Sequence, residues 1–173
     1  MIGPQDPVPL LRALAAAGVE HVVIGGFAVI SYGVVRVTKD LDICPAPDGA
    51  NLQRLARCLA DLEVTQIGAG DFDTHEMPFD PTRAQDLEEG GNFRLECELG
   101  VLDVMQWISG VDADRAYDVL GGGAVTAEVD GVPVRICSLA HLRAMKRAAG
   151  RPQDLQDLAD LAIAHGDDGD ESG

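Results

Sequence analysis

The sequence predicts an α+β domain, a mixed α/β fold in which a short mixed β-sheet is flanked by helices. Helix-like and strand-like segments are interspersed along the chain, which excludes an all-helical or all-strand architecture. Several strand-like segments follow one another closely enough to form hairpins, whose strands are antiparallel. A doubly wound, purely parallel sheet is therefore disfavoured. Two helix-like segments near the C-terminus complete the expected architecture.

The length and composition fit one domain. The chain has 173 residues, of which 46% are apolar and 24% charged, values typical of a globular domain with a hydrophobic core. We assign residues 1–165 to a single domain. Residues 166–173 are acidic and rich in glycine, and this composition predicts a disordered tail.

The charge and the cysteines exclude several classes of protein. With 29 acidic residues against 13 lysines and arginines, the formal net charge of -16 repels polyanions and argues against a broad nucleic-acid-binding surface. The 4 cysteines lie far apart, without zinc-ligand spacing, and are expected to be buried free thiols. No apolar stretch reaches the roughly 18 residues of a membrane span and no secretory leader pattern is present, so we expect a cytoplasmic protein.

The first elements follow from capping signals and apolar patterns. Asp6 and Pro7 form an N-cap and a first-turn proline, and apolar residues then recur at helical spacing until Gly18. The β-branched run 20–24 predicts a strand. A short helix of small and apolar residues follows and ends at Gly33.

The next segment predicts a second strand, over 41–44, and a second amphipathic helix. A proline-containing break follows the strand, and leucines then recur at helical intervals over 52–62. Residues 63–92 lose this periodicity and are expected to form loops with one extended piece.

The second half contains two hairpin patterns and two helices. Alternation over 93–99 followed by the apolar run 101–107 predicts one hairpin. The second hairpin pairs 125–129 with 132–136 around an Asp-Gly turn, and the glycine-rich segment between the two hairpins is expected to be a loop. A helix capped by Ser138 runs to a glycine, and a final helix covers 152–165.

Three features point to a catalytic site. The pair Gly25-Gly26 ends an apolar strand, Asp40 and Asp42 flank a leucine at the start of the next strand, and Asp103 interrupts an apolar run. Residues i and i+2 of a strand point to one face about 6.5 to 7 Å apart, so Asp40 and Asp42 can aim at a common point. Two hard divalent cations about 3.5 to 4 Å apart would fit between such carboxylates.

The third carboxylate and the glycines complete this site. A buried carboxylate at Asp103 needs a partner; if its strand neighbours that of Asp42, it adds a metal ligand and a base for an attacking hydroxyl. Backbone without Cβ atoms at Gly25 and Gly26 can approach phosphate oxygens. Together these parts are typical of phosphoryl or nucleotidyl transfer.

Each feature also has an ordinary interpretation. A glycine pair is commonly a turn, an Asp-x-Asp pair is commonly a solvated strand end, and Asp103 could simply bond an arginine. Glu96 or Glu98 could replace Asp103 as third carboxylate, although their alternation places them on the more solvated face. The joint occurrence in one order favours the functional interpretation.

The stretch from Gly25 to Asp42, with the pattern Gly-Gly, short helix, Arg-x-Thr-x-Asp-x-Asp, resembles the polymerase-beta-like nucleotidyltransferase superfamily. More narrowly, it looks like the small bacterial nucleotidyltransferases related to AbiEii-type toxins. The segment 142–158 is similar to that group's closing pattern of Lys followed by Arg-x-x-Asp-x-x-Asp-Leu. The resemblance covers most of residues 20–161, and 63–92 contributes nothing specific to it.

This resemblance implies a nucleotidyltransferase fold that binds a magnesium nucleoside triphosphate. Gly25 and Gly26 would contact the triphosphate, and Asp40 and Asp42 would hold two Mg²⁺ ions. Asp103 would match the third catalytic carboxylate.

Further basic and polar residues are candidates for the nucleotide site. Lys146 interrupts an apolar helical stripe, and two interpretations stay open: an inward ammonium that reaches a phosphate, or a side chain lying along the surface. Arg36 and Thr38 could bond phosphate or support the entry of the strand. The pattern at Arg151 and the aspartates after it favours an ion-paired helix start.

The predicted function is metal-dependent transfer of a nucleotide from an NTP to an unidentified acceptor. A protein, an RNA end or a small-molecule hydroxyl would serve, and the negative charge disfavours RNA. A toxin–antitoxin pair with a cognate partner protein would fit the AbiEii resemblance. The alternative is a catalytically silent antitoxin or partner-binding module that keeps the fold, against which the intact Asp40 and Asp42 speak.

Overall fold

The computed structural model describes residues 4–68 and 78–167. The elements follow along the chain as α1 (Val8–Ala16), β1 (His21–Ile24), α2 (Gly25–Ser31), β2 (Leu41–Pro45), α3 (Gly49–Asp61), β3 (Thr65–Gln66), α4 (Ala84–Glu88), β4 (Asn92–Cys97), β5 (Gly100–Met105), a 3₁₀ turn η2 (Ala113–Arg115), α5 (Ala116–Gly122), β6 (Val125–Val129), β7 (Val132–Ile136), α6 (Leu139–Ala149) and α7 (Pro152–His165).

The strands form one mixed sheet of 7 strands in the order β3-β4-β5-β2-β1-β7-β6. Strand β2 pairs in parallel with β5, and β1 pairs in parallel with β7, whereas the other neighbours are antiparallel. Both predicted hairpins are present, as β4–β5 and β6–β7. The predicted α+β class with a mixed sheet is therefore confirmed.

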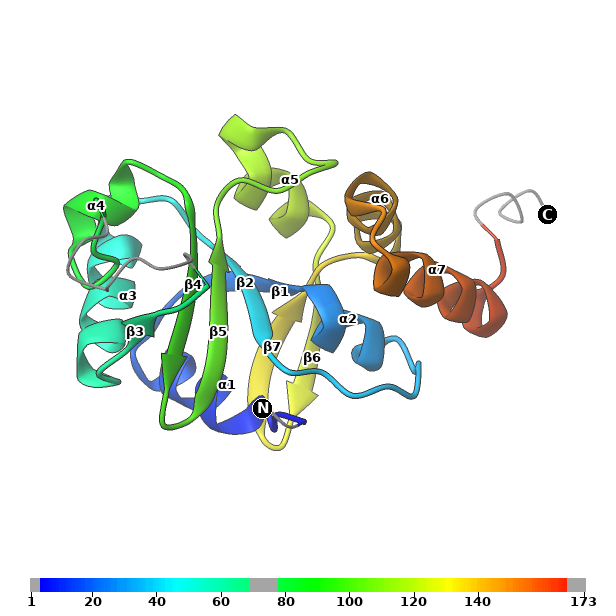
Figure 1. The fold of residues 1–173 in the computed structure, drawn as a ribbon, viewed down its shortest axis with the longest axis horizontal. Helices are drawn as coiled ribbons and strands as arrows, with labels where there is room; N and C mark the ends of the chain where they lie inside the picture. Colours follow the sequence, from blue (N-terminus) through cyan, green and yellow to red (C-terminus); the bar gives the residue numbers. More distant parts are fainter. Residues whose placement is uncertain (1–3, 69–77, 168–173) are drawn as a thin grey trace.

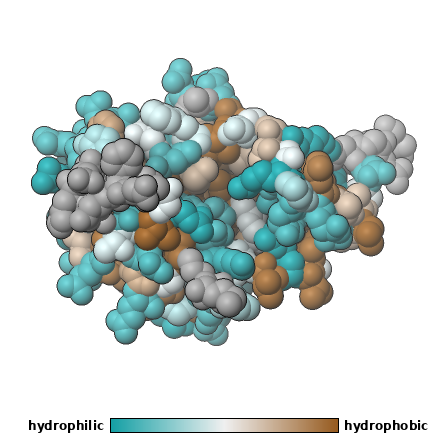
Figure 2. Space-filling model, viewed as in Figure 1, coloured by the Kyte–Doolittle hydropathy of each residue, from teal (hydrophilic) through white to brown (hydrophobic). Residues whose placement is uncertain are grey.

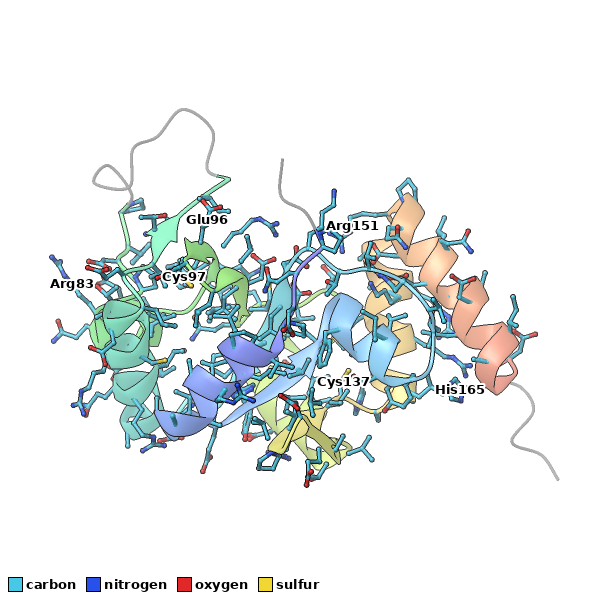
Figure 3. The ribbon with its side chains drawn as sticks, turned by 90° about the horizontal axis from the view of Figure 1, so that it is seen from below. Arg83, Glu96, Cys97, Cys137, Arg151 and His165 are labelled. Atoms are coloured by element: carbon cyan, nitrogen blue, oxygen red, sulfur yellow. The ribbon has the colours of Figure 1, made fainter. Side chains whose placement is uncertain are left out.

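The helices gather at the two ends of the sheet and over its middle (Figure 1). Helices α3 and α4 lie together at the β3–β4 end of the sheet, and α6 and α7 pack against each other at the opposite end of the molecule, next to α2. Seen from below, α1 and α2 lie in front of the sheet, and Arg151 and His165 mark the two ends of α7 (Figure 3). The strand β1 and the start of α2 thus lie between the two groups of helices.

Leucines at helical spacing build the core. Leu10 and Leu14 of α1 and Leu52, Leu55 and Leu59 of α3 are fully buried against the sheet. Hydrophilic residues cover most of the face seen in Figure 2, between small apolar patches. Among the described residues, Cys44, Cys58 and Cys137 are the predicted buried free thiols and Cys97 is half-buried. Within those ranges, none of the helices has the length and apolar character needed to cross a membrane.

The capping signals mark most helix ends correctly. Ser138 caps α6 by accepting a hydrogen bond from the His141 amide, and Gly150 ends this helix with a φ of 61°. The predicted cap at Asp6 is wrong by one residue: Pro7 takes the N-cap position, and Asp6 accepts from the Val8 amide at 3.0 Å. Residues 168–173 of the predicted tail lie outside the described residues.

Two helices lie where loops were expected. Helices α4 and α5 have 5 and 7 residues, too few for a visible apolar repeat, and α5 ends in glycines of low helix propensity. Tertiary contacts stabilise α5, because the Arg135 guanidinium donates to the Gly121 carbonyl at 2.7 Å. The extended piece expected within 63–92 is β3, and strand β5 ends at Met105, before the predicted Trp107.

Candidate active site

The sheet register brings the three predicted aspartates together. Asp42 is paired with Asp103 across β2 and β5, and with Ile24, directly before Gly25, across β1 and β2. Carboxylate oxygens of Asp40, Asp42 and Asp103 lie within 4.8 Å of one another. Asp103 is buried, and the other two are half-buried. The alternatives Glu96 and Glu98 are exposed, so they do not form the third member of this group.

Burial and mutual repulsion perturb these acids. Desolvation, together with the charges of Asp40 and Asp103, raises the pKa of Asp42 to about 8. Desolvation also raises the pKa of Asp103, and the charge of Arg94 opposes this increase. A cluster of this kind needs a cation to hold all its carboxylates ionised. Three hard oxygen donors in close proximity suit Mg²⁺ or another hard divalent ion.

Arg94, which the sequence patterns did not indicate, bridges the cluster. It lies directly opposite Asp103 in the β4–β5 hairpin. Its Nη1 donates to Asp103 Oδ2 at 2.6 Å and to Asp40 Oδ2 at 3.0 Å. The register of the predicted hairpin is the signal that could have found it, since the residue opposite Asp103 shares its face of the sheet. The ordinary interpretation of Asp103 as an arginine partner therefore holds alongside its membership of the cluster.

Because the Arg94 guanidinium and a divalent ion would both neutralise Asp40 and Asp103, we expect them to compete. Arg94→Gln should lower the metal-free stability by about 1–3 kcal/mol, since hydrogen-bonded charges lose their partner. The same variant should bind Mg²⁺ or Mn²⁺ about tenfold more tightly in isothermal titration calorimetry, a gain of about 1.4 kcal/mol. Arg83→Gln, which removes a guanidinium exposed beside Asp80, is the matched control and should change neither quantity. Weaker metal binding by Arg94→Gln would contradict competition.

The glycine pair lies against the carboxylates. Gly25 has a φ of +69°, and a Cβ atom there would overlap Oδ2 of Asp42. A Cβ on Gly26 would lie 3.0 Å from the Thr38 hydroxyl and 3.2 Å from Arg36 Nη2. Only residues without a side chain let α2 start this close to the aspartates. Thr38 is itself buried and donates to the Asp40 carbonyl at 2.9 Å, which holds the entry to β2.

A cluster of charges, buried or half-buried except at Arg151, joins α6, α7 and the segment after α2. Lys146 points inward, with Nζ 3.0 Å from Asp154 Oδ1 and 2.7 Å from Asp157 Oδ2. Arg36 Nη1 donates to both oxygens of Asp157 at 2.7 and 2.6 Å. Arg151 donates to Asp154 at 2.7 Å and starts α7, as the pattern predicted. Three cations thus face two carboxylates, so this cluster carries one net positive charge.

Removing Lys146 should damage the fold as well as the site. Lys146→Met would leave Asp154 and Asp157 buried with one cation fewer, and breaking such a pair typically costs about 3–5 kcal/mol. We expect a lower midpoint in urea unfolding followed by circular dichroism. The control is Lys39→Met on the exposed loop before β2, which should keep the wild-type midpoint. An unchanged midpoint for Lys146→Met would show that the two arginines suffice to neutralise the aspartates.

The acidic cluster, the glycine pair and the cations near Lys146 line one cavity of about 540 Å³. The glycine pair, the aspartates and Arg94 form one part of its wall, and Arg36, Lys146 and Arg151 form the cationic part. An apolar part is made by Ile24, Met105, Ile108, Leu142 and Met145. The cavity can therefore receive a ligand with a metal-bound polyanion and a flat or apolar group. Of the residues predicted for the site, Thr38 lies beneath this wall and the others line it.

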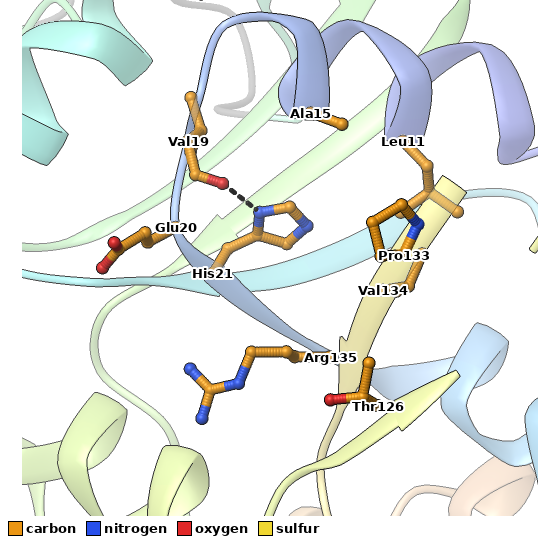
Figure 4. A pocket seen from close by; sticks show the side chains of 9 residues that line it. All are labelled: Leu11, Ala15, Val19, Glu20, His21, Thr126, Pro133, Val134 and Arg135. Atoms are coloured by element: carbon orange, nitrogen blue, oxygen red, sulfur yellow. Dashed lines mark hydrogen bonds between the residues drawn. The ribbon is translucent and has the colours of Figure 1, made fainter. Parts of the chain in front are cut away.

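A second cavity of about 390 Å³ lies at the start of β1 and contains none of these groups (Figure 4). His21 projects between α1 and β7, and its Nδ1 lies 3.0 Å from the Val19 carbonyl. Its Nε2 is buried and has no hydrogen-bond partner among the described residues. Desolvation lowers the pKa of His21, and the nearby Arg135 acts in the same direction.

This environment predicts acid-sensitive stability. As the pH falls below about 6.5, the unfolded chain protonates at His21 while the folded chain resists, so stability falls by up to about 1.4 kcal/mol per pH unit. His21→Phe should flatten the pH profile of the unfolding free energy in that range. Equal slopes for wild type and His21→Phe would contradict the lowered pKa.

Comparison with solved structures identifies the fold as that of the nucleotidyltransferases. The lincosamide antibiotic adenylyltransferase LnuA, solved with lincomycin bound, superposes with a TM-score of 0.62 at 14% identity, covering 94% of this chain and 99% of that chain. ANT(2'')-Ia in complex with adenylyl-2''-tobramycin gives 0.54 at 18% identity, covering 90% and 84%. An antigenic nucleotidyltransferase-like protein from Paracoccidioides brasiliensis gives 0.56 at 16% identity, covering 94% and 77%. Neither a protein-family model nor a curated protein matches the sequence.

Proposed function

We propose that the protein is a metal-dependent nucleotidyltransferase that transfers a nucleoside monophosphate from an NTP to an acceptor hydroxyl. The observation that carries this proposal is the meeting of Asp40, Asp42 and Asp103 in one cavity, beside a glycine pair and a cationic wall. The nucleotidyltransferase fold supports the same assignment. In the reaction, the acceptor oxygen bonds to the α-phosphorus, the bond to the β-phosphate oxygen breaks, and pyrophosphate leaves.

The three carboxylates are the residues that would hold Mg²⁺. Their hard oxygen donors fit this ion, and their repulsion is relieved by it. When bound, such an ion neutralises phosphate charge and acidifies a coordinated hydroxyl. Asp103, on strand β5, would take the proton of the acceptor hydroxyl. We propose the requirement for magnesium and the role of each aspartate together with the activity.

The rest of the cavity divides between the two ends of the nucleotide. Gly25 and Gly26 leave room for phosphate oxygens, and Arg36 and Lys146 supply the positive charge that a triphosphate needs. The wall that includes Met105, Ile108 and Met145 offers an apolar surface for the base. Arg94, freed from the aspartates by a metal ion, would become available to a phosphate oxygen.

For the acceptor we favour the hydroxyl of a small molecule. LnuA is described as a lincosamide antibiotic adenylyltransferase, and ANT(2'')-Ia was solved with adenylyl-2''-tobramycin; this chain covers 99% and 84% of their lengths. The net charge of -16 disfavours RNA and suits a cationic acceptor. A protein acceptor would instead support the AbiEii resemblance and a toxin–antitoxin role.

The test is label transfer from each α-³²P-labelled NTP, with Mg²⁺, into separated metabolite, protein and RNA fractions. We expect label in the metabolite fraction with wild type and none with Asp40→Asn/Asp42→Asn. Label confined to the protein or RNA fraction would replace the favoured acceptor. No aspartate-dependent label in any fraction, from a folded protein, would overturn the enzyme assignment in favour of a silent binding module.

A further inference from the structure

The sheet ends in an open strand edge at β6. Strand β6 is the last in the strand order, and the described residues place no strand beyond it (Figure 1). The opposite edge strand, β3, has 2 residues, whereas β6 has 5. Short strands, lysines, prolines and bulges normally protect a sheet edge. β6 reads Val-Thr-Ala-Glu-Val: it has no lysine, proline or bulge, and Glu128 is its one charged side chain.

The pairing of β6 with β7 fixes which backbone groups face outward. Glu128 lies opposite Pro133, which lacks an N–H group, so this pair cannot be the one that exchanges hydrogen bonds. Because bonded and non-bonded pairs alternate in an antiparallel ladder, the pair Thr126–Arg135 is also non-bonded. The N–H and C=O groups of Thr126 and Glu128 therefore point away from β7, toward the open edge.

This edge is complementary to itself. If two copies meet antiparallel about a twofold axis at Ala127, Thr126 of each copy lies opposite Glu128 of the other. These are the residues whose backbone groups point outward, so both pairs can exchange hydrogen bonds. Val125 then lies opposite Val129. No glutamate faces a glutamate, whereas an axis at Glu128 would place two like charges directly opposite.

The side chains on the core side of β6 support the same partner. Val125 is 50% exposed, and Ala127 and Val129 are half-buried against the core. These residues continue the buried row Val132, Val134 and Ile136 of β7 to the edge, where it ends uncovered. A second copy would extend the row with its own valines and alanine.

We propose that two copies of this chain associate through β6, antiparallel about Ala127, into one continuous sheet. The interface is independent of the nucleotidyl-transfer proposal, since it contains none of the residues that line the cavity of about 540 Å³. Its partner is a second copy of the same chain, because one short strand carries complementary hydrogen bonds and apolar residues under a single twofold axis, with no like charges opposite each other.

Charge substitutions at exposed Thr126 test the register. Thr126→Glu places carboxylates opposite Glu128 at both ends of the contact, and Thr126→Lys places ammonium groups there. Sedimentation velocity over a concentration series should show a wild-type dimer of the 18.2 kDa chain. With two cross-strand pairs per dimer, Kd should rise roughly tenfold for Thr126→Glu and fall for Thr126→Lys, with smaller differences at high salt.

A compensating variant distinguishes this partner from any other. Thr126→Glu/Glu128→Lys restores opposite charges only if residue 126 faces residue 128 of a second copy, so it should recover the dimer. A wild-type monomer throughout the concentration series, or equal Kd values for all variants, would overturn the proposal. So would a dimer that Thr126→Glu leaves intact, since it would use another surface.

Cross-linking tests the axis directly. Ala127→Cys, in a Cys97→Ser background, places two cysteines opposite each other at a Cα separation of about 4.5 Å, within disulfide range. Oxidation should give a covalent dimer on a non-reducing gel. The control Thr126→Cys in the same background should not cross-link efficiently, because that residue faces Glu128. Equal cross-linking at both positions, or none at Ala127→Cys, would contradict the register.

Discussion

Asp42→Asn is expected to abolish nucleotidyl transfer while leaving the metal-free fold as stable as wild type or more so. Asp42 lies between Gly25 and Asp103 and contributes one of the oxygens of the predicted metal site. Metal ions contribute several kcal/mol to stabilising charge in a transition state, so losing this ligand should reduce the rate by a factor of about 10³ or more. The measurement is single-turnover label transfer from α-³²P-NTP at saturating Mg²⁺.

The gain in stability follows from the same crowding of carboxylates. Folding raises the pKa of Asp42 to about 8, mainly through burial, from an ordinary value of 3.8. Between these values the folded chain binds more protons than the unfolded chain, so metal-free stability falls as the pH rises. A neutral amide does not titrate in this range, and the substitution should therefore remove the decline. A gain of about 1 kcal/mol would raise Tm by about 2–4 °C.

The control is Asp61→Asn, which removes a carboxylate from the exposed end of α3. It changes the net charge by the same amount and should keep the transfer rate of the wild type. Full transfer activity in Asp42→Asn would show that Asp42 is not a metal ligand. Marked destabilisation in EDTA would contradict the raised pKa.

Gly25→Ala should inactivate the protein through geometry alone. The new methyl group would collide with Asp42 Oδ2, and the residue would be held at a φ of +69°. The backbone strain of a left-handed alanine costs about 1–2 kcal/mol, and the collision must in addition displace the carboxylate or the start of α2. We expect transfer activity to fall by a factor of about 10² or more, as small misplacements of reacting groups commonly cause.

Gly33→Ala separates strain from collision. Gly33 has a φ of +90°, and a Cβ there meets no atom within 4 Å. In thermal unfolding this variant should lose only the stability that the backbone strain costs, and it should retain its transfer activity. If Gly33→Ala lost activity to the same extent as Gly25→Ala, general strain would explain both results and the contact with Asp42 would be irrelevant.

The sequence predicts the residues of this site better than the contacts between them. The common direction of Asp40 and Asp42 follows from the two-residue repeat of a strand, although β2 begins at Leu41 and Asp40 lies in the bend before it. The meeting of Asp42 with Asp103 depends on parallel pairing of β2 with β5, which local patterns do not determine. Arg94 alternates with apolar residues along β4, a pattern that indicates an exposed side chain. Its partner Asp103 lies on the other strand of the hairpin, where a local pattern does not show it. Lys146 could be placed on an apolar stripe, but its aspartate partners lie on a separate helix.

The aspartates that hold Arg36 and Lys146 in the cationic wall of the cavity lie on α7. This helix is synthesised after every strand of the described sheet. Arg36 meets Asp157 across a sequence separation of 121 residues, and His165 contacts the Tyr32 carbonyl across 133. These contacts can form only after α7 has been made, and closing loops of this length costs entropy that grows slowly with their length. During synthesis the strands can therefore assemble before α7 arrives, while Arg36 and Lys146 still lack their carboxylates. The nucleotide cavity is completed only once α7 has been made, so a product truncated before this helix would carry the aspartates without an organised site.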